Sequence, residues 1–260
     1  MGEIVVRADG PVGWLVLSNP SRRNAVTYAM WRAIPEALRQ LAAHPDIRTI
    51  AISGDGDEAF VSGGDISEFE TVRGTREADA EYNRVVDEAC LAPLLCPKPV
   101  LAKIHGFCMG GGLALAASCD VRIASDNAVF RMPAARLGVG YWFNGIRRLV
   151  QVLGPTNTAD IFFSARKFEA QEALRMGLLT RVVPRAALDD EFARYCAMVG
   201  DNAPLTMMAA KAAILASLQD SDLRDMAVLG QKIAGCWASD DYREGRDAFL
   251  EKRKAKFSGS

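Results

Sequence analysis

The chain lacks several features that would assign it to a specialised class of protein. Its 260 residues carry 31 Lys and Arg against 32 Asp and Glu, so there is no positive excess for sequence-independent binding to nucleic acid. No apolar run approaches the roughly 20 residues that are needed to span a bilayer. We therefore expect no nucleic-acid partner and no membrane association.

Metal ligands and disulfide motifs are also scarce. The chain has two histidines, His44 and His105, and its six cysteines form no CxxC pair, so we expect no metal site. We expect the cysteines to be buried, reduced thiols of a cytoplasmic protein. Residues 1–10 open a strand pattern without the basic and apolar segments of a signal peptide, which agrees with that location.

Carboxylates are unevenly distributed along the chain. Residues 89–159 contain only Asp120 and Asp126, where an even spread would place roughly nine acids. Whatever chemistry this segment performs, its own sequence offers few acid or base groups.

Apolar periodicity predicts an α/β protein. Alternating apolar residues predict a β-hairpin over residues 3–7 and 12–17, and helical spacing predicts an amphipathic helix over residues 27–44, kinked or delayed by Pro35. Beyond Tyr141 the pattern is mainly helical and includes one helical stretch from Asp222 to the end. We expect an α/β core followed by a helical C-terminal region.

Two glycine-rich loops, at residues 62–65 and 109–112, each fall where a predicted strand gives way to a predicted helix. The first N–H groups of a helix lack partners within it, and glycine lets a ligand oxygen approach them without obstruction by a Cβ atom. Each loop is therefore a candidate oxyanion donor. The alternative, that the glycines only permit tight turns and close packing, stays open for either loop alone.

Six ordered segments resemble the enoyl-CoA hydratase/isomerase, or crotonase, family. The resemblance runs from about residue 5 to residue 257, and six motifs in order are far more specific than one glycine run. The segments are NPSRRNAV (19–26), AFVSGGDI (59–66), KPV through GFCMGGG (98–112), CDVRIAS (119–125), EALRMGL (172–178) and FLEKRK (249–254).

This resemblance implies a crotonase-like spiral core of ββα repeats with a coenzyme A site in residues 1–200. Residues 201–260 would form a helical region that packs trimers, with hexamers as dimers of trimers. The implied partners are an acyl-CoA substrate and further copies of the chain. No separate cofactor is implied, because coenzyme A is part of the substrate.

The shared chemistry of the family is stabilisation of a thioester enolate by two backbone N–H groups. Carried over by position, these donors are Gly64 and Gly111. Both lie in the loops that local chemistry already selects, and Gly111 would begin a helix whose N-terminal dipole favours the developing negative charge.

The resemblance also implies a set of residues that bind coenzyme A. Arg23 would approach its phosphates, and the backbone of Ala25 its adenine. Lys252 in the basic tail is available to a phosphate, although a solvated helix end explains it equally well. The turn of residues 19–25, together with the segment Gly64, Asp65, Ile66 and Ser67, would hold the adenosine and pantetheine parts of the coenzyme.

The chain departs from the family at both catalytic glutamates. Counting along the motifs places Ala114 and Ala134 where hydratases have them. Hydration needs one group to deprotonate water and another to protonate the α-carbon, and losing such a group typically costs about 10²–10⁴-fold in rate. Residues 134–146 also lack the acid that family isomerases and dehalogenases use. Ordinary hydration is therefore not expected.

A reaction that generates its own enolate needs no protein base, and decarboxylation of a 2-carboxyacyl thioester is such a reaction. Residues 137–141 and 239–254 are similar to the methylmalonyl-CoA decarboxylase branch, in which a tyrosine at the place of Tyr141 faces the substrate carboxylate. A phenol can hydrogen-bond a carboxylate and stay neutral at pH 7. That branch places a histidine where Gly64 stands, so the match is incomplete.

Two alternatives remain open from the sequence. One is an enoyl-CoA hydratase or isomerase of fatty-acid or of aromatic or branched acyl-CoA metabolism. The other is a family member that binds acyl-CoA without catalysis. Turnover of a thioester panel would separate the second from the enzymes.

The other polar candidates are expected to be structural. We expect His105 to be a structural hydrogen-bonder, Asp65 a helix N-cap or turn residue, Glu68 an exposed helix residue and Asp120 a strand-start residue. Cys108 has no adjacent base and is not expected to be a nucleophile.

Three further expectations concern residues 134–146. Arg136 and Asn144 either bind a polar acyl group or are a surface arginine and a turn asparagine. Tyr141, Trp142 and Phe143 form either a pocket wall or core.

Overall fold

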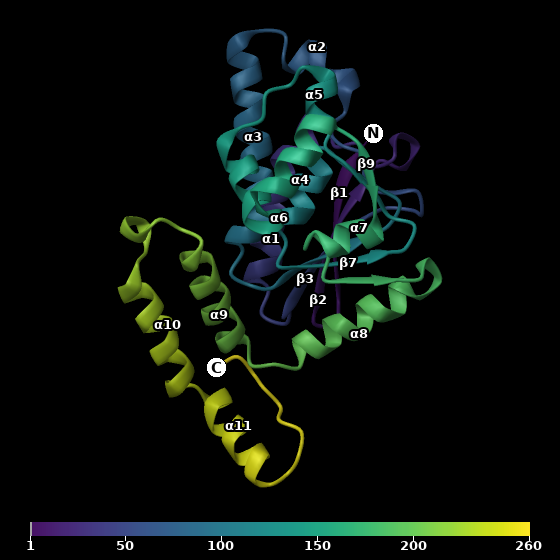
Figure 1. The fold of residues 1–260 in the computed structure, drawn as a ribbon. Coiled ribbons are helices and arrows are strands. Elements are labelled where there is room, and N and C mark those ends of the chain that lie inside the picture. The colour runs from purple at the N-terminus through teal and green to yellow at the C-terminus, as the bar shows by residue number, and fades with distance from the viewer. Residues whose placement is uncertain (1) are drawn as a thin grey trace.

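The computed structural model describes residues 2–260 and has the α/β architecture that the sequence predicts (Figure 1). Its larger sheet has the strand order β1-β2-β3-β5-β7-β10; β1 and β2 form the predicted antiparallel hairpin, and the other neighbours are parallel. These strands are β1 (Glu3–Asp9), β2 (Val12–Ser18), β3 (Thr49–Gly54), β5 (Val100–Ile104), β7 (Val121–Ser125) and β10 (Arg181–Val183).

A smaller sheet has the order β4-β6-β8-β9, with β8 and β9 antiparallel and the other pairs parallel. Its strands are β4 (Ala59–Val61), β6 (Phe107–Met109), β8 (Val129–Arg131) and β9 (Lys167–Glu169). Each has three residues, which is too short for a period-2 pattern to stand out in the sequence. Pairing with neighbours from distant parts of the chain is what makes them strands.

The helices alternate with the strands in the first two thirds of the chain and dominate the last third. They are α1 (Tyr28–Ala43), α2 (Phe69–Val72), α3 (Arg76–Leu95), α4 (Gly111–Ser118), α5 (Ala134–Leu137), α6 (Phe143–Ser164), α7 (Ala170–Arg175), α8 (Leu188–Gly200), α9 (Pro204–Ser217), α10 (Met226–Ala238) and α11 (Asp240–Leu250).

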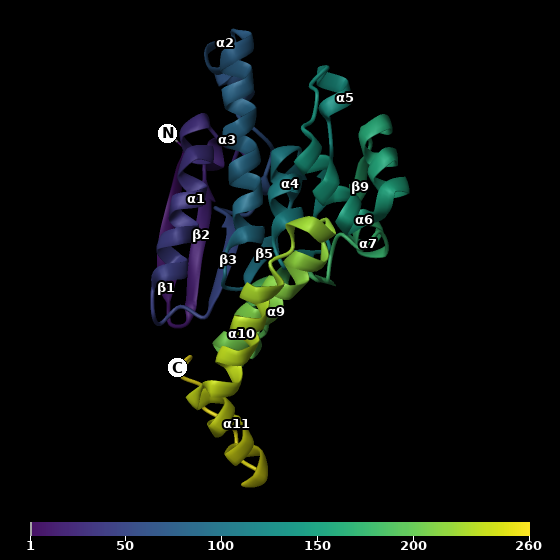
Figure 2. The ribbon, with the colours of Figure 1, turned by 90° about the vertical axis from the view of Figure 1, so that its left-hand side faces the viewer.

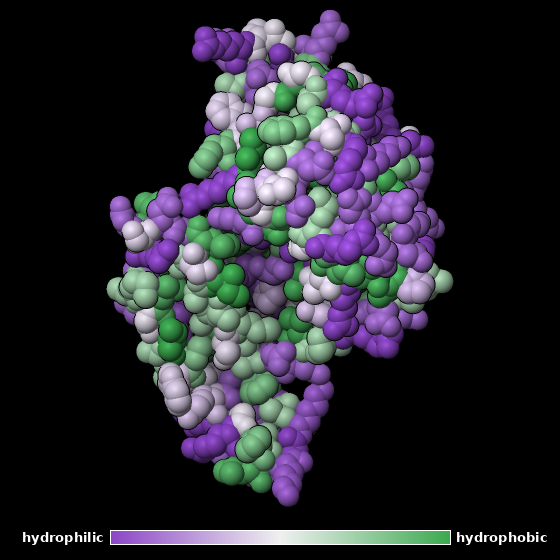
Figure 3. Space-filling view, in the orientation of Figure 1, coloured by the Kyte–Doolittle hydropathy of each residue, from purple (hydrophilic) through white to green (hydrophobic). Residues whose placement is uncertain are grey.

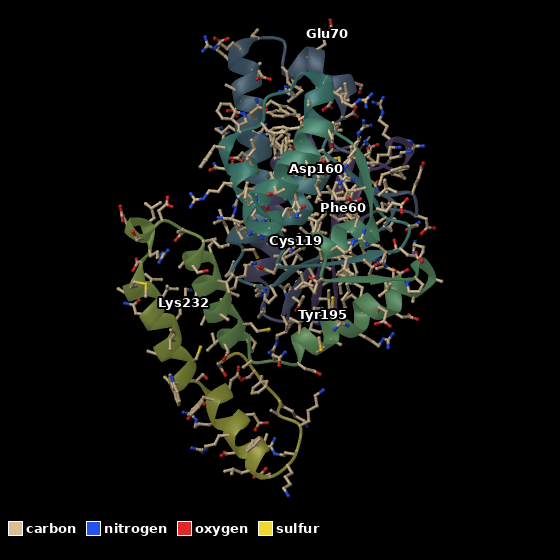
Figure 4. All side chains as sticks on the ribbon, in the orientation of Figure 1. Phe60, Glu70, Cys119, Asp160, Tyr195 and Lys232 are labelled. Carbon is tan, nitrogen blue, oxygen red and sulfur yellow. The ribbon has the colours of Figure 1, made fainter. Side chains whose placement is uncertain are left out.

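Both faces of the larger sheet are covered (Figures 1 and 2). On one face the apolar side chains of α1, α3 and α4 complete the main core, in which Phe60 and Cys119 are buried (Figure 4). On the other face Leu188 and Phe192 of α8 pack against Leu101 of β5. Coverage of both faces explains why every residue of β3 is buried and why β5 is apolar except at Lys103.

The C-terminal helices α9, α10 and α11 extend away from the sheets (Figures 1 and 2), which confirms the predicted helical C-terminal region. The single helical stretch expected from Asp222 onward is wrong. Ser239 ends α10 and caps α11 by accepting a hydrogen bond from the Tyr242 backbone N–H, and residues 251–260 form no helix. A cap of this kind favours a new helix start over continuation of the preceding helix.

All six cysteines are free thiols, as expected. Five are buried, but Cys236 is only half-buried because it lies on α10, which has no buried residue. The expectation of six buried thiols is therefore wrong at this position. Across residues 2–260, no helix is both long enough and apolar enough to cross a membrane.

Candidate active site

The two glycine-rich loops lie side by side. Strands β4 and β6 are parallel neighbours, so the loops that follow them leave from the same edge of the smaller sheet. A Cβ atom placed on Gly110 would lie 4.0 Å from the Cα of Gly63. Segments almost fifty residues apart in sequence therefore meet at one point.

The backbone N–H groups of Gly64 and Gly111 are free at that point. Gly111 is the first residue of α4, where a helical N–H has no partner within the helix. Within residues 2–260 neither nitrogen donates a hydrogen bond to another group. Two free donors beside each other are what an enolate oxygen requires.

Close approach of aromatic side chains excludes any larger residue at both positions. A Cβ atom on Gly64 would lie 2.7 Å from the hydroxyl oxygen of Tyr82, and one on Gly111 would lie 2.9 Å from the Trp31 ring. Both distances are shorter than normal contacts. The packing explanation therefore holds at both positions, and the role of the two N–H groups as oxyanion donors stays a prediction.

A cavity opens in front of the two donors, and Gly64, Gly111, Ile66 and Tyr141 line it. Its remaining walls come from α3, α4, α5 and the segment before α6. Most of the lining is apolar, which strengthens electrostatic interactions inside it.

Ala114 and Ala134 both line this cavity, each with 6% of its surface exposed. The two positions at which the family resemblance predicts glutamates therefore face the site, and each carries only a methyl group. No proton can be taken or given there.

Tyr141 lies between α5 and α6, and its ring packs edge-on against Phe162 with centroids 5.2 Å apart. Burial raises the pKa of the Tyr141 phenol well above its usual value, so the group is a neutral donor near pH 7. Trp142 also lines the cavity, whereas Phe143 is exposed and does not. Of these three aromatic residues, Tyr141 and Trp142 form part of the pocket wall and Phe143 does not.

Asp87 is a cavity residue that the sequence analysis missed. It lies on α3, is half-buried, and accepts a hydrogen bond of 2.8 Å at Oδ2 from Asn144 Nδ2 at the start of α6. Among the cavity-lining side chains of residues 2–260 it is the one carboxylate. Residues 89–159 are short of acids, as expected. The carboxylate of Asp87, which lies on α3 two residues before that segment begins, nevertheless reaches the cavity.

Tyr82 and Arg73 form a second group that the sequence did not reveal. Tyr82 is 6% exposed and lines the cavity beside Gly64, and burial raises the pKa of its phenol to about 12. The Arg73 guanidinium lies 4.8 Å above the Phe69 ring and 4.9 Å above the Tyr82 ring, and its Nε donates to Asp79. Helical spacing on α3, where Tyr82, Val86 and Cys90 share a face, was the available signal.

Comparison with known proteins agrees with this geometry. The family model described as enoyl-CoA hydratase/isomerase matches residues 8–260. The chain belongs to this family. A crotonyl-CoA hydratase of Syntrophomonas wolfei is 31% identical over 98% of the chain and 97% of the relative.

Solved structures of family proteins superpose over nearly the whole chain. One from Hyphomonas neptunium has a TM-score of 0.91 at 34% identity, covering 98% of this chain and 97% of its own. One described as an enoyl-CoA hydratase/carnithine racemase, from Magnetospirillum magneticum, has a TM-score of 0.92 at 33% identity, covering 100% and 97%. The crotonase-like fold expected from the six motifs is therefore confirmed.

In this hydratase/isomerase family member, three of the residues expected to bind coenzyme A line the cavity, namely Gly64, Ile66 and Gly111. Arg23 is ion-paired with Glu58 at 2.6 Å, and its guanidinium lies over the Phe107 ring. Both charged side chains are exposed, so the guanidinium can exchange this partner for a phosphate at small cost.

Ala25 and Asp65 form hydrogen bonds with other residues of the same chain. The Ala25 N–H donates to Arg22 O and its carbonyl accepts from Asn19 Nδ2, so only a second lone pair of that carbonyl remains for a ligand. Asp65 caps the 3₁₀ turn Ile66–Glu68 by accepting from the Ser67 N–H, as predicted, and it also pairs with Arg22 at 2.9 Å. This network fixes the loop that presents Gly64.

Lys252 is far from the cavity within one chain. It follows α11, which lies at the opposite end of the molecule from α2 and α5 in both ribbon views (Figures 1 and 2). Glu70 on α2 marks the cavity end of the molecule in Figure 4. A contact between Lys252 and a coenzyme would therefore require another copy of the chain.

The remaining polar candidates are structural, with two differences from expectation. Asp120 Oδ2 accepts from the Val100 N–H, and buried Cys108 lies outside the cavity lining. Glu68 is half-buried rather than exposed, because its Oε2 accepts from the Tyr28 N–H at the start of α1. His105 is buried, but within residues 2–260 its Nε2 has no hydrogen-bond partner, so the expected bond is absent at that atom.

Arg136 is exposed and outside the cavity lining, as a surface arginine would be. Asn144 is not a turn residue; it belongs to α6 and acts on the cavity only through Asp87. As for metals, no three His, Cys, Asp or Glu side chains gather into an ion-binding group in the part of the chain that the structure describes.

Proposed function

We propose that this protein decarboxylates a 2-carboxyacyl-CoA thioester. The observation that carries the proposal is one cavity with two free backbone donors and a neutral phenol, Tyr141, in which Ala114 and Ala134 occupy the positions of the family glutamates. The site can stabilise an enolate, and those two positions cannot supply the acid and base that hydration needs.

The reaction balances without an added base. The bond between the α-carbon and the carboxylate breaks, carbon dioxide leaves, and the electron pair moves into the thioester to form an enolate. Gly64 and Gly111 donate hydrogen bonds to the enolate oxygen, while Tyr141 orients the departing carboxylate as a hydrogen-bond donor. Protonation of the α-carbon completes the acyl-CoA product.

The test is incubation with methylmalonyl-CoA and, separately, with crotonyl-CoA, each followed by mass spectrometry. We expect loss of carbon dioxide from the first and little addition of water to the second. Efficient hydration of crotonyl-CoA with no decarboxylation would overturn the proposal. Tight binding of acyl-CoA with no turnover of any thioester would instead support a non-catalytic binding protein.

A second candidate is hydration or isomerisation of an enoyl-CoA, and Asp87 is the observation that favours it. The cavity holds this one carboxylate, and named relatives are hydratases. In this reaction Asp87 would act as the acid or base in place of the two missing glutamates. Its replacement by asparagine should then abolish turnover, whereas a decarboxylase with the mechanism above should retain it.

For substrate binding, we propose that Arg23 and the backbone of Ala25 hold the nucleotide part of coenzyme A and that residues 64–67 hold the pantetheine. Lys252 would reach a phosphate only from a neighbouring copy. Coenzyme A enters and leaves as part of the substrate, so no separate cofactor is proposed.

We further propose a homotrimer, or a dimer of trimers, assembled through α9–α11. Figure 3 shows hydrophobic residues gathered over α9 and α10, and large exposed apolar side chains on the three helices include Ile214, Ile233, Trp237 and Phe249. Exposed patches of this kind mark protein interfaces. Light scattering after gel filtration measures the oligomer, and a monomer would overturn this.

The free thiols favour the cytoplasm as the location of the reaction.

A further inference from the structure

Tyr82 is held rigidly in the wall of the cavity. Its ring stacks on Tyr28 with centroids 5.9 Å apart and meets Phe69 edge-on at 5.6 Å. The Arg73 guanidinium covers the same ring at 4.9 Å. One neighbour on α1 and two on the α2 turn therefore fix the direction in which the phenol points.

The hydroxyl of Tyr82 lies next to Gly64, one of the two proposed oxyanion donors. A Cβ atom on Gly64 would lie only 2.7 Å from Tyr82 Oη, so the hydroxyl lies directly beside the Gly64 backbone. A thioester oxygen bound to the Gly64 N–H would sit about 2.9 Å from that nitrogen. The α-carbon is two bonds away from that oxygen, which brings it within reach of the same hydroxyl.

The phenol also has the protonation state of a donor. With its pKa raised to about 12 by burial, Tyr82 keeps its proton throughout the physiological range. Tyr141 lines the same cavity, but the proposed mechanism uses it to orient the departing carboxylate. Asp87 is engaged by Asn144 at 2.8 Å.

We propose that the Tyr82 hydroxyl delivers the proton to the α-carbon of the enolate. The Oη–H bond breaks and a C–H bond forms, the enolate electrons re-form the thioester carbonyl, and the resulting phenolate regains a proton from water. The inference rests on the enolate chemistry of the proposed function, but it applies equally to decarboxylation and to hydration, since both end with a proton on this carbon.

The test compares Tyr82→Phe with Tyr28→Phe. Tyr28 stacks on Tyr82 without lining the cavity, so its substitution controls for changed aromatic packing. Tyr82→Phe should lower kcat by about 10²-fold, with KM and the dissociation constant of propionyl-CoA changed by no more than about threefold. Tyr28→Phe should behave like the wild type.

A stereochemical readout separates proton delivery from a structural role. In deuterium oxide the wild type should place deuterium on one face of the α-carbon, whereas Tyr82→Phe should give both epimers because water protonates the enolate from either side. A single epimer from Tyr82→Phe, both epimers from the wild type, or a fall in kcat that matches an equal loss of propionyl-CoA binding would each overturn the assignment.

The same measurements keep this inference distinct from the proposed function. If the wild type hydrates crotonyl-CoA but leaves methylmalonyl-CoA intact, the decarboxylation proposal is wrong. The role of Tyr82 is then tested by the position of deuterium on the α-carbon of the hydration product. If the wild type turns over neither thioester, both proposals fail.

Discussion

Asn144 on α6 donates a 2.8 Å hydrogen bond to Asp87 on α3. The bond joins two helices that begin 67 residues apart in sequence, and it holds the one carboxylate that lines the cavity of residues 2–260. How this carboxylate is used decides between the two candidate reactions.

Substitutions of Asp87 and Asn144 should separate decarboxylation from hydration. If the protein decarboxylates through Tyr141, Asp87→Asn should leave kcat close to that of the wild type, because no carboxylate is needed to form the enolate. If it hydrates or isomerises, Asp87→Asn should reduce kcat by about 10²–10⁴-fold. Asn144→Ala, which keeps the carboxylate but frees it, serves as the matched variant, and both rates are measured by mass spectrometry.

Tyr141→Phe should lower carbon dioxide release from methylmalonyl-CoA by about tenfold or more, because the variant loses the hydrogen bond to the departing carboxylate. The ring and its edge-on contact with Phe162 are retained, so folding should not change. The rate of carbon dioxide release and the melting temperature are measured together. An unchanged rate would reject this role for Tyr141.

Gly64→Ala should reduce kcat by about 10²–10³-fold, the usual cost of losing one oxyanion donor. The added methyl group would lie 2.7 Å from Tyr82 Oη and would shift the loop that presents the N–H group. Gly200→Ala at the C-terminal end of α8 is the control, because its added Cβ atom would come no closer than 3.8 Å to another group. Equal activity of both variants would contradict the assignment of Gly64 as a donor.

Lys211 joins the C-terminal region to the core, and its loss should destabilise the fold. Its Nζ lies 2.6 Å from Asp120 Oδ2 and also donates to Pro93 O and Lys98 O. Lys211→Met should lower the free energy of unfolding by about 3–5 kcal/mol, because the Asp120 carboxylate is left without its buried partner.

A companion variant tests whether that carboxylate is the cause. Adding Asp120→Asn to Lys211→Met should restore part of the lost stability, as measured by denaturant titration. No restoration would show that the cost comes from packing alone.

The raised pKa of Tyr82 predicts a loss of stability at high pH. A folded-state pKa of about 12, above the ordinary value of 10.0, means that the stability is fully present below pH 10 and is lost as the pH rises toward 12. Tyr82→Phe should therefore lose less stability than the wild type between these values. Denaturant titrations at several pH values measure this, and identical slopes for the two proteins would contradict it.

Much of the fold and part of the site were predictable because their determinants are local. The hairpin and α1 follow from periodicity, and the six motifs identify the family. Ala114 and Ala134 were found by counting within those motifs. Strands β4, β6 and β9 of the smaller sheet escaped because three residues carry no periodic signal.

By itself, then, the sequence determined the α/β class and the family. The donor pair Gly64 and Gly111 and the loss of both catalytic glutamates remain predictions that it makes. Only the tertiary structure decided which side chains meet at the cavity. It brings Tyr82 and Asp87 of α3 to the cavity, pairs Arg23 with Glu58, and puts Lys252 at the far end of the molecule. A sequence motif contains only residues that are close together along the chain. The acid and base groups that line a cavity come from helices and strands that are distant in sequence and meet only when the chain folds.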